Sequence, residues 1–192
     1  MLTELTDHQF FDAELQHRAK LLYTEADIEA AIQRIAQRIN HDYQGRTPII
    51  LVVMTGAVPF AGRLLPQLSV PLELDYCHVS RYDGALRGDK LDWRVYPALN
   101  LHDRDVIVVD DILDEGITLH AILDFCHSQG VASVRSAVLI DKQHDRKAFD
   151  GQQADYCELS APDYYLFGYG MDYRKQWRNA KEIYALITHD PH

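Results

Sequence analysis

The sequence holds no apolar run close to the roughly 20 residues that a membrane-spanning helix needs. Its N-terminus lacks the basic start and apolar middle of a secretory signal peptide. Cysteine is scarce, and Cys77, Cys126 and Cys157 are widely spaced, with no CxxC pair and no Cys/His metal spacing. These absences argue against membrane binding, a disulfide framework and a zinc site, and they favour a reduced, cytoplasmic setting.

Positive charge is also in short supply. The chain carries 19 Lys and Arg against 29 Asp and Glu, a formal net charge of -10. Such a balance argues against non-specific binding of nucleic acid or anionic lipid, but it leaves room for a local basic pocket around a phosphorylated ligand. The motifs GxSxG, GxGxxG and GxxxxGK[ST] do not occur, so the key loops of α/β-hydrolases, Rossmann dinucleotide domains and P-loop enzymes are missing.

What the chain does carry is an alternation of strand and helix patterns. Apolar, β-branched or alternating runs predict strands over Pro48–Met54, 71–79, 106–109 and 133–140. Apolar residues at helical spacing predict helices over 27–40, with Asp27 as the N-cap, over 58–65 and over 117–128. The polar stretch 80–92 is expected to be a loop. This order predicts an α/β fold in which helices cover both faces of a mainly parallel sheet.

Ligands of such sheets bind at the carboxyl ends of the strands. The segment Val108–Thr118 lies at one of these ends, where two adjacent acids, a third acid and a Gly-x-Thr helix start follow a buried strand. Backbone N–H groups at the helix start can cradle a phosphate, and paired carboxylates can hold ribose hydroxyls or a Mg²⁺ shell. The alternative is that Asp111 and Asp114 merely cap the helix. Three acids in this pattern favour the binding site.

The same segment resembles the signature of type I phosphoribosyltransferases for 5-phosphoribosyl-1-pyrophosphate (PRPP), and residues 48 to 180 resemble the hypoxanthine-guanine phosphoribosyltransferases in colinear order. The resemblance implies a five-stranded parallel sheet flanked by helices, with a hood over the active site built from both chain ends. It also implies one domain over residues 1–192, with its core at about 27–142 and its hood at about 1–20 and 155–192.

The resemblance assigns the PRPP site to the central motif. Asp110 and Asp111 would hold the ribose hydroxyls, directly or through Mg²⁺ as cofactor. The 5′-phosphate would lie on Asp114, Glu115, Gly116, Ile117 and Thr118. Asp114 would also sit near N7 of the purine, as the candidate general base.

Pyrophosphate binding is expected from Thr55, Gly56 and Arg178. The alternatives are a plain strand-to-helix turn at Gly56 and a surface salt bridge at Arg178. Many family members have a lysine where Thr55 stands, which puts a lysine contact in doubt but leaves backbone contacts possible. The segment Ser80, Arg81, Tyr82 would close over the site; Arg81 stands where serine is more usual and is equally well read as solvent-facing.

The purine would be held from the later part of the chain. By resemblance, Lys142 donates to the O6 atom of the purine, Tyr165 stacks on its ring, and Leu166 offers backbone groups to its edge. An ammonium group only donates, so Lys142 selects a 6-oxo over a 6-amino purine. Asp172 would also take part in purine binding and would join Asp110 and Asp111 as a Mg²⁺ ligand. An exposed lysine and an aromatic core strand are the alternatives.

The sequence therefore predicts a purine-salvage phosphoribosyltransferase that uses PRPP and a 6-oxopurine, forms a homodimer or homotetramer, and binds neither nucleic acid nor membrane. One alternative is a preference for xanthine or guanine. Another is a non-catalytic regulator of the same fold that binds PRPP and nucleic acid, for which a basic face or a lost acidic motif would be expected.

Overall fold

The computed structural model describes residues 13–81, 91–149 and 151–187. Its centre is a six-stranded sheet in the order β4-β3-β2-β5-β6-β7. The strands are β2 (Ile49–Met54), β3 (Glu73–Arg81), β4 (Leu91–Val95), β5 (Asp105–Leu113), β6 (Ser133–Gln143) and β7 (Leu159–Pro162). All neighbours pair in parallel except β3 and β4, which are antiparallel. The expected five-stranded parallel sheet is confirmed, with β4 added at one edge.

Two strands run further than the sequence pattern predicts. The apolar run of β5 ends at Val109, but parallel pairing with β6 continues to Leu113, which lies opposite Asp141. Asp110 and Asp111 are therefore part of the strand and do not belong to a loop. Strand β6 extends past Ile140 to Gln143 because it gains β7 as a second partner, so Lys142 also stands on a strand. Backbone pairing continues wherever a neighbouring strand offers partners, whatever the side chains are.

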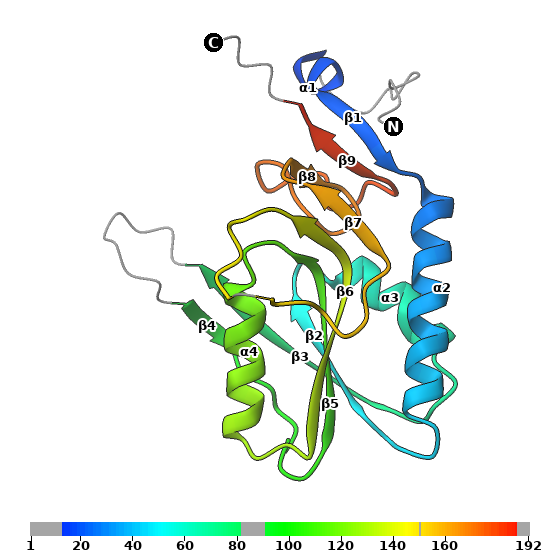
Figure 1. Cartoon of the computed structure of the whole chain (residues 1–192), viewed down its shortest axis with the longest axis vertical. Helices are drawn as coiled ribbons and strands as arrows, with labels where there is room; N and C mark the ends of the chain where they lie inside the picture. The colour runs from blue at the N-terminus through cyan, green and yellow to red at the C-terminus, as the bar shows by residue number, and fades with distance from the viewer. Residues whose placement is uncertain (1–12, 82–90, 150, 188–192) are drawn as a thin grey trace.

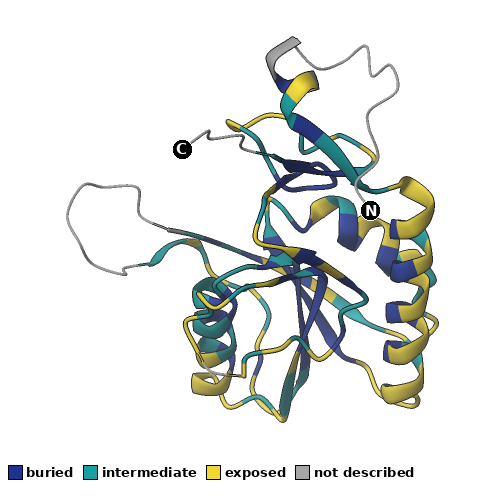
Figure 2. Ribbon diagram, turned by 45° about the horizontal axis from the view of Figure 1, so that its top comes forward, coloured by how far each residue is buried: buried dark blue, intermediate teal, exposed yellow. Residues whose placement is uncertain are grey.

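Three helices cover the sheet from both sides (Figure 1). Helices α2 (Glu25–Asp42) and α3 (Val58–Leu64), the latter followed by the 3-10 turn η1 (Leu65–Gln67), lie on one face. Helix α4 (Ile117–Ser128) lies on the other. Each face has its own buried cluster, one including Ile32, Ile50 and Ile107 and the other Leu51, Val108 and Ile122. In Figure 2 the buried stripe of α2 faces the sheet and its opposite side is exposed.

The start of α2 differs from expectation. Thr24 is the N-cap, and Asp27 is the third residue of the first turn. The Asp27 N–H donates to the Thr24 hydroxyl at 3.2 Å, and the Thr24 N–H donates to the Asp27 carboxylate at 3.0 Å. This reciprocal capping box satisfies two backbone donors that have no partner within the helix.

A second, three-stranded antiparallel sheet joins the two ends of the described chain. It has the order β1-β9-β8, from β1 (Ala19–Tyr23), β9 (Ile183–Leu186) and β8 (Tyr165–Phe167), and α1 (Ala13–Arg18) precedes it. Figure 1 shows this hood beyond the carboxyl ends of β2, β5 and β6. Strand β7 falls within the range expected for the hood but extends the central sheet instead. Among the described helices, none is long and apolar enough to cross a membrane.

Candidate active site

A pocket of about 290 Å³ opens at the carboxyl ends of β2, β3 and β5. Its wall brings together segments that are far apart in the sequence. Of the residues expected at the site, those that line it are Thr55, Gly56, Ser80, Asp110, Asp111, Asp114, Glu115, Gly116, Thr118 and Arg178. The pocket therefore unites the expected ribose, phosphate and pyrophosphate segments in one place.

The paired acids at the end of β5 form the floor of this pocket, with Asp110 buried and Asp111 half-buried. The Asp111 N–H donates to the Asp110 carboxylate at 2.9 Å. Burial raises the pKa of Asp110 well above its usual range, and the neighbouring charge of Asp111 raises it further. Burial also raises the pKa of Asp111, although the Arg178 guanidinium opposes that rise. Two adjacent carboxylates that are largely withdrawn from water are destabilised as anions until a cation or hydroxyl donors meet them.

The loop after β5 leads through Gly116 into the N-terminus of α4. Gly116 is the N-cap residue of α4 and has φ +84°, in the left-handed region that glycine tolerates without strain. A side chain at this position would also collide with the amide of Gln152, whose Nε2 donates to the Gly116 carbonyl at 3.2 Å. Gly116 and Thr118 line the pocket at the start of α4, and the first N–H groups of a helix have no partner within the helix.

The loop after β2 packs closely against the segment that connects β8 and β9 of the hood. Gly170 has φ +105°, and a Cβ there would run into the Gly56 carbonyl, so the two glycine backbones are in close approach. Arg178 donates to the Gly170 carbonyl at 2.5 Å and to the Asp172 carboxylate at 2.6 Å. The other Asp172 oxygen accepts the Lys175 N–H at 2.7 Å. Asp172 is not part of the pocket wall and reaches it through Arg178.

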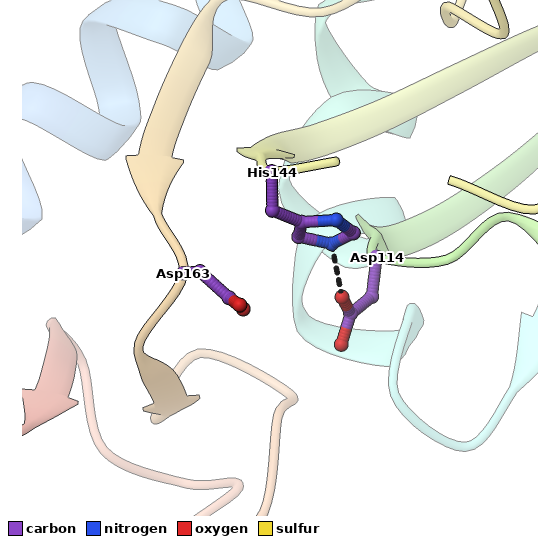
Figure 3. Close-up of side chains that lie close together, drawn as sticks. All are labelled: Asp114, His144 and Asp163. Atoms are coloured by element: carbon purple, nitrogen blue, oxygen red, sulfur yellow. Dashed lines mark hydrogen bonds and ion pairs between the residues drawn. The ribbon is translucent and has the colours of Figure 1, made fainter. Parts of the chain in front are cut away.

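Asp114 lines the pocket and stands in a network of charged and polar groups, of which Figure 3 shows His144 and Asp163. Its Oδ1 is 2.7 Å from Nε2 of His144, and its Oδ2 is 3.2 Å from Nζ of Lys142. Lys142 also lies 3.2 Å from Asp163, which forms an ion pair with Arg146. Burial raises the pKa of Asp114, but the hydrogen bond from His144 and the charge of Lys142 outweigh it and hold this pKa below its ordinary value.

Five residues of this region carried no role in the sequence prediction. His144, Arg146 and Asp163 surround Asp114, Gln152 covers Gly116, and His78 lines the pocket. Arg146 holds the pKa of Asp163 at about 2 through a hydrogen bond, with help from Lys142. The position of His144 two residues beyond Lys142, at a strand end, was the available signal. A lone His or Asp in a loop carries no such signal on its own.

The remaining residues expected at the site differ in how far they are buried and in whether they line the pocket. Leu166 is buried, whereas Tyr165 is 52% exposed, with its hydroxyl donating to the Asp172 carbonyl at 2.7 Å. Ile117 begins α4 but does not line the pocket. In the closing segment, Ser80 and the backbone of Arg81 end β3, and Tyr82 lies outside the described residues. The Ser80 hydroxyl oxygen is buried and has no hydrogen-bond partner within the described ranges.

Comparisons with known proteins agree with this geometry. The family described as "Phosphoribosyl transferase domain" matches residues 19–174. The hypoxanthine-guanine-xanthine phosphoribosyltransferase of Tritrichomonas foetus is 34% identical over 87% of this chain and 91% of its own length. The hypoxanthine-guanine phosphoribosyltransferase of Streptococcus thermophilus is 32% identical over 87% of this chain and 92% of its own length.

Solved structures give the same result. The crystal structure of a hypoxanthine phosphoribosyltransferase from Staphylococcus aureus superposes with a TM-score of 0.84 at 28% identity, covering 93% of this chain and 97% of that one. The Trypanosoma cruzi hypoxanthine phosphoribosyl transferase gives 0.82 at 25%, covering 95% of both. The pocket, the acidic motif that forms its floor and these likenesses together show that the chain belongs to the phosphoribosyltransferase family, among the hypoxanthine-guanine phosphoribosyltransferases.

Proposed function

We propose that this chain transfers the 5-phosphoribosyl group of PRPP to N9 of hypoxanthine and guanine, releasing pyrophosphate and the corresponding nucleotide. One observation carries the proposal: the paired acids Asp110 and Asp111, the cradle at 114–118 and Arg178 share one pocket, and Lys142 is bonded to Asp114 beside it. Polar groups for a ribose, a phosphate and a 6-oxopurine are thus within reach of each other. The names of the relatives point to the same substrates.

PRPP would occupy the pocket along its whole length. Asp110 and Asp111 would take the ribose hydroxyls, and the N–H groups from Asp114 to Thr118 would take the 5′-phosphate. Thr55 and Gly56 would offer backbone donors to the pyrophosphate, with the planar fork of Arg178 beside them. Ser80 lines the same pocket, and its hydroxyl, which has no hydrogen-bond partner among the described residues, would gain one from this ligand. We extend this role to Arg81 and Tyr82, as a segment that closes over bound PRPP.

Phosphoribosyltransferases of this family generally depend on a metal ion. We propose Mg²⁺, and the residues fit it: Asp110 is buried, Asp111 is half-buried, and the loss of water raises the pKa of both carboxyl groups, a destabilisation that a divalent cation would relieve. Asp172 would join them as a third ligand of the ion, through the same carboxylate that accepts hydrogen bonds from Arg178 and from the Lys175 N–H. When bound, the ion would neutralise charge on the leaving pyrophosphate.

The chain's own residues would manage the proton. As N9 of the purine bonds to C1 of the ribose and the C1–oxygen bond to pyrophosphate breaks, the ring must lose the proton held at N7. Asp114, ionised because its pKa is low, would accept that proton. Lys142 would donate to O6, while Tyr165 and Leu166 would hold the ring face and edge.

The direct test is an assay of the purified protein with PRPP, Mg²⁺ and each of four bases: hypoxanthine, guanine, xanthine and adenine. We expect turnover of hypoxanthine and guanine, loss of activity with excess EDTA, and no turnover of adenine. The assay with xanthine tests the alternative that this chain also uses or prefers xanthine. The name of the Tritrichomonas foetus relative, which includes xanthine, favours that alternative. Binding of PRPP with no turnover of any base would contradict the proposal and favour the regulator.

Lys142→Met is expected to raise KM for hypoxanthine about 10- to 100-fold, the range for a hydrogen bond to a charged group. The methionine keeps most of the length of this side chain, which is only 7% exposed, and removes its charge. KM for PRPP should change much less. The exposed Lys181, replaced in the same way, is the matched control. Unchanged hypoxanthine kinetics in the first variant would remove Lys142 from purine recognition.

The proposal includes a homodimer or homotetramer. Val58 on α3 and Leu74 and Tyr76 on β3 are exposed apolar residues, and Leu74 and Tyr76 share a strand face with the pocket residue Ser80. A second copy placed there would cover apolar area next to the active site. Sedimentation equilibrium that gave only the monomer mass of 22.1 kDa would contradict it.

We also propose a cytoplasmic location, because the three cysteines form no disulfide and a reducing compartment keeps thiols in that state. Fractionation of cells expressing the chain, with recovery outside the cytosol, would contradict this location.

A further inference from the structure

We infer that His144 is a positioning residue for Asp114: it holds Oδ1 of this carboxylate and leaves Oδ2 as the oxygen that accepts the purine proton. The inference rests on the proposed function, because it assigns the proton acceptor to one atom of that site. It starts from a 2.7 Å contact between His144 Nε2 and Asp114 Oδ1, made by an imidazole that is only 4% exposed.

The hydrogen bonds of His144 settle where its proton lies. The backbone N–H of Arg146 donates to Nδ1 at 3.0 Å, so Nδ1 is an acceptor and carries no hydrogen. In the neutral ring the hydrogen then sits on Nε2, which therefore donates to Asp114 Oδ1. This arrangement excludes a role for His144 as a second base toward Asp114, since Nε2 has no lone pair to offer.

The same bonds argue against a metal ion here. Asp114, His144 and Asp163 each offer an atom within 4.8 Å of the others, as Figure 3 shows for their side chains. However, Nε2 is protonated in this tautomer and cannot act as a ligand. Lys142 and Arg146 already face the two carboxylates: Lys142 is 3.2 Å from each, and Arg146 is 2.5 Å from Asp163. A further cation would have to displace one of them.

The charges around Asp114 explain why a neutral donor is useful. Lys142 contacts Oδ2, and Arg146 lies 3.9 Å from Oδ1 but is also committed to Asp163 and Glu115. Three carboxylates and two cations face one another, and neutral His144 orients Asp114 without adding charge. Its donor occupies Oδ1, so of the two oxygens only Oδ2 is left to turn to a ligand. Lys142, shared with Asp163, can move from Oδ2 to the purine O6.

The backbone makes this clamp rigid. His144 follows directly after β6, and Asp114 follows directly after β5, where the two strands pair in parallel up to Leu113 opposite Asp141. Both side chains therefore start from neighbouring strand ends. The Asp114 carboxylate is attached to one strand end and hydrogen-bonded to a side chain from the neighbouring strand end, so its position is restricted. This matters because a displacement of about 1 Å can greatly slow general-base catalysis.

Two variants separate the donor from the mere presence of a side chain. His144→Gln places an amide N–H donor near the position of Nε2, whereas His144→Leu fills the space without a donor. His127→Leu, an exposed histidine at the end of α4, is the control. We expect His144→Leu to lower kcat for hypoxanthine about 10- to 100-fold with KM for PRPP little changed. His144→Gln should retain kcat within about threefold of the wild type, because it keeps the donor.

A second readout does not need turnover. The carboxyl ¹³C resonance of Asp114, followed by NMR against pH, should titrate about one pH unit higher in His144→Leu than in wild type, because a donor to the charged form is gone. It should move little in His144→Gln. The inference would be overturned if His144→Leu kept the wild-type kcat, or if both variants lost kcat equally. It would also be overturned if the titration of Asp114 were the same in His144→Leu as in wild type. If the wild type turned over no purine, the proposed function would fail, but the titration would still show whether His144 donates a hydrogen bond to Asp114.

Discussion

Asp114→Asn is expected to lower kcat for hypoxanthine by about 10² to 10⁴, the usual contribution of a general base. The amide nearly matches the carboxylate in shape and can still accept the Nε2–H of His144, which lies 2.7 Å away. What disappears is the negative charge and the ability to take the N7 proton. KM and Kd for PRPP should stay within about threefold, because the proposed phosphate cradle would use backbone groups that the substitution does not touch.

The measurement is single-turnover kinetics with enzyme in excess, because a slow product release can hide a loss in the chemical step. PRPP affinity is measured separately by calorimetry. Asp124→Asn is the matched control: it removes one carboxylate from the exposed face of α4, where Asp124 contacts His120 and lies outside the pocket wall. Lost PRPP binding with an intact chemical step at saturation would sink the assignment of Asp114 as the base.

Gly56→Ala is expected to reduce kcat/KM for PRPP by about 100-fold, as misplacement of a binding group by about 1 Å can do. A Cβ built on Gly56 comes closer than 3.0 Å to all three atoms of the Asp111 carboxyl group. Asp111 would have to leave its place on the pocket floor, or the loop after β2 would have to retreat. The carbonyl of Gly56 is packed against Gly170, so the second way is also obstructed.

Stability should fall together with activity, by about 1–3 kcal/mol, the usual cost of overpacking a site that has no room for an added group. Gly62→Ala is the control, since a Cβ on this α3 glycine meets nothing within 4 Å. There the same substitution should leave kcat/KM unchanged and raise the free energy of unfolding by about 0.4–1 kcal/mol. Both variants are measured by PRPP kinetics and by thermal unfolding. Wild-type PRPP kinetics in Gly56→Ala would show that Asp111 is not needed where it now stands.

The sequence by itself determined the chemistry that is local in the chain. The strand, two acids, third acid and Gly-x-Thr of residues 108–118 predicted a phosphate cradle with carboxylates beside it, and in the structure Asp110, Asp111, Asp114, Gly116 and Thr118 all line one pocket. Such a motif can be read because a buried strand followed by a helix start leaves its loop few shapes. The parallel sheet followed from buried β-branched runs, since these are typical of strands covered on both faces.

Element limits were harder to predict than the elements themselves. Asp110, Asp111 and Lys142 were expected at or beyond strand ends, but lie on strands because parallel pairing carries β5 and β6 further than their apolar runs. Strand β7 was expected in the hood and joins the central sheet. In both cases a neighbouring strand supplied the hydrogen bonds, and that neighbour is distant in sequence.

Only the tertiary structure decided what surrounds Asp114. His144 and Asp163 lie 30 and 49 positions further along the chain, and the sequence does not show that either of them reaches Asp114. They meet Asp114 because β6 pairs with β5 on one side and with β7 on the other, which places the segments after three strand ends together. A polar side chain acquires its partner from sheet order and register, and these depend on packing across the whole molecule.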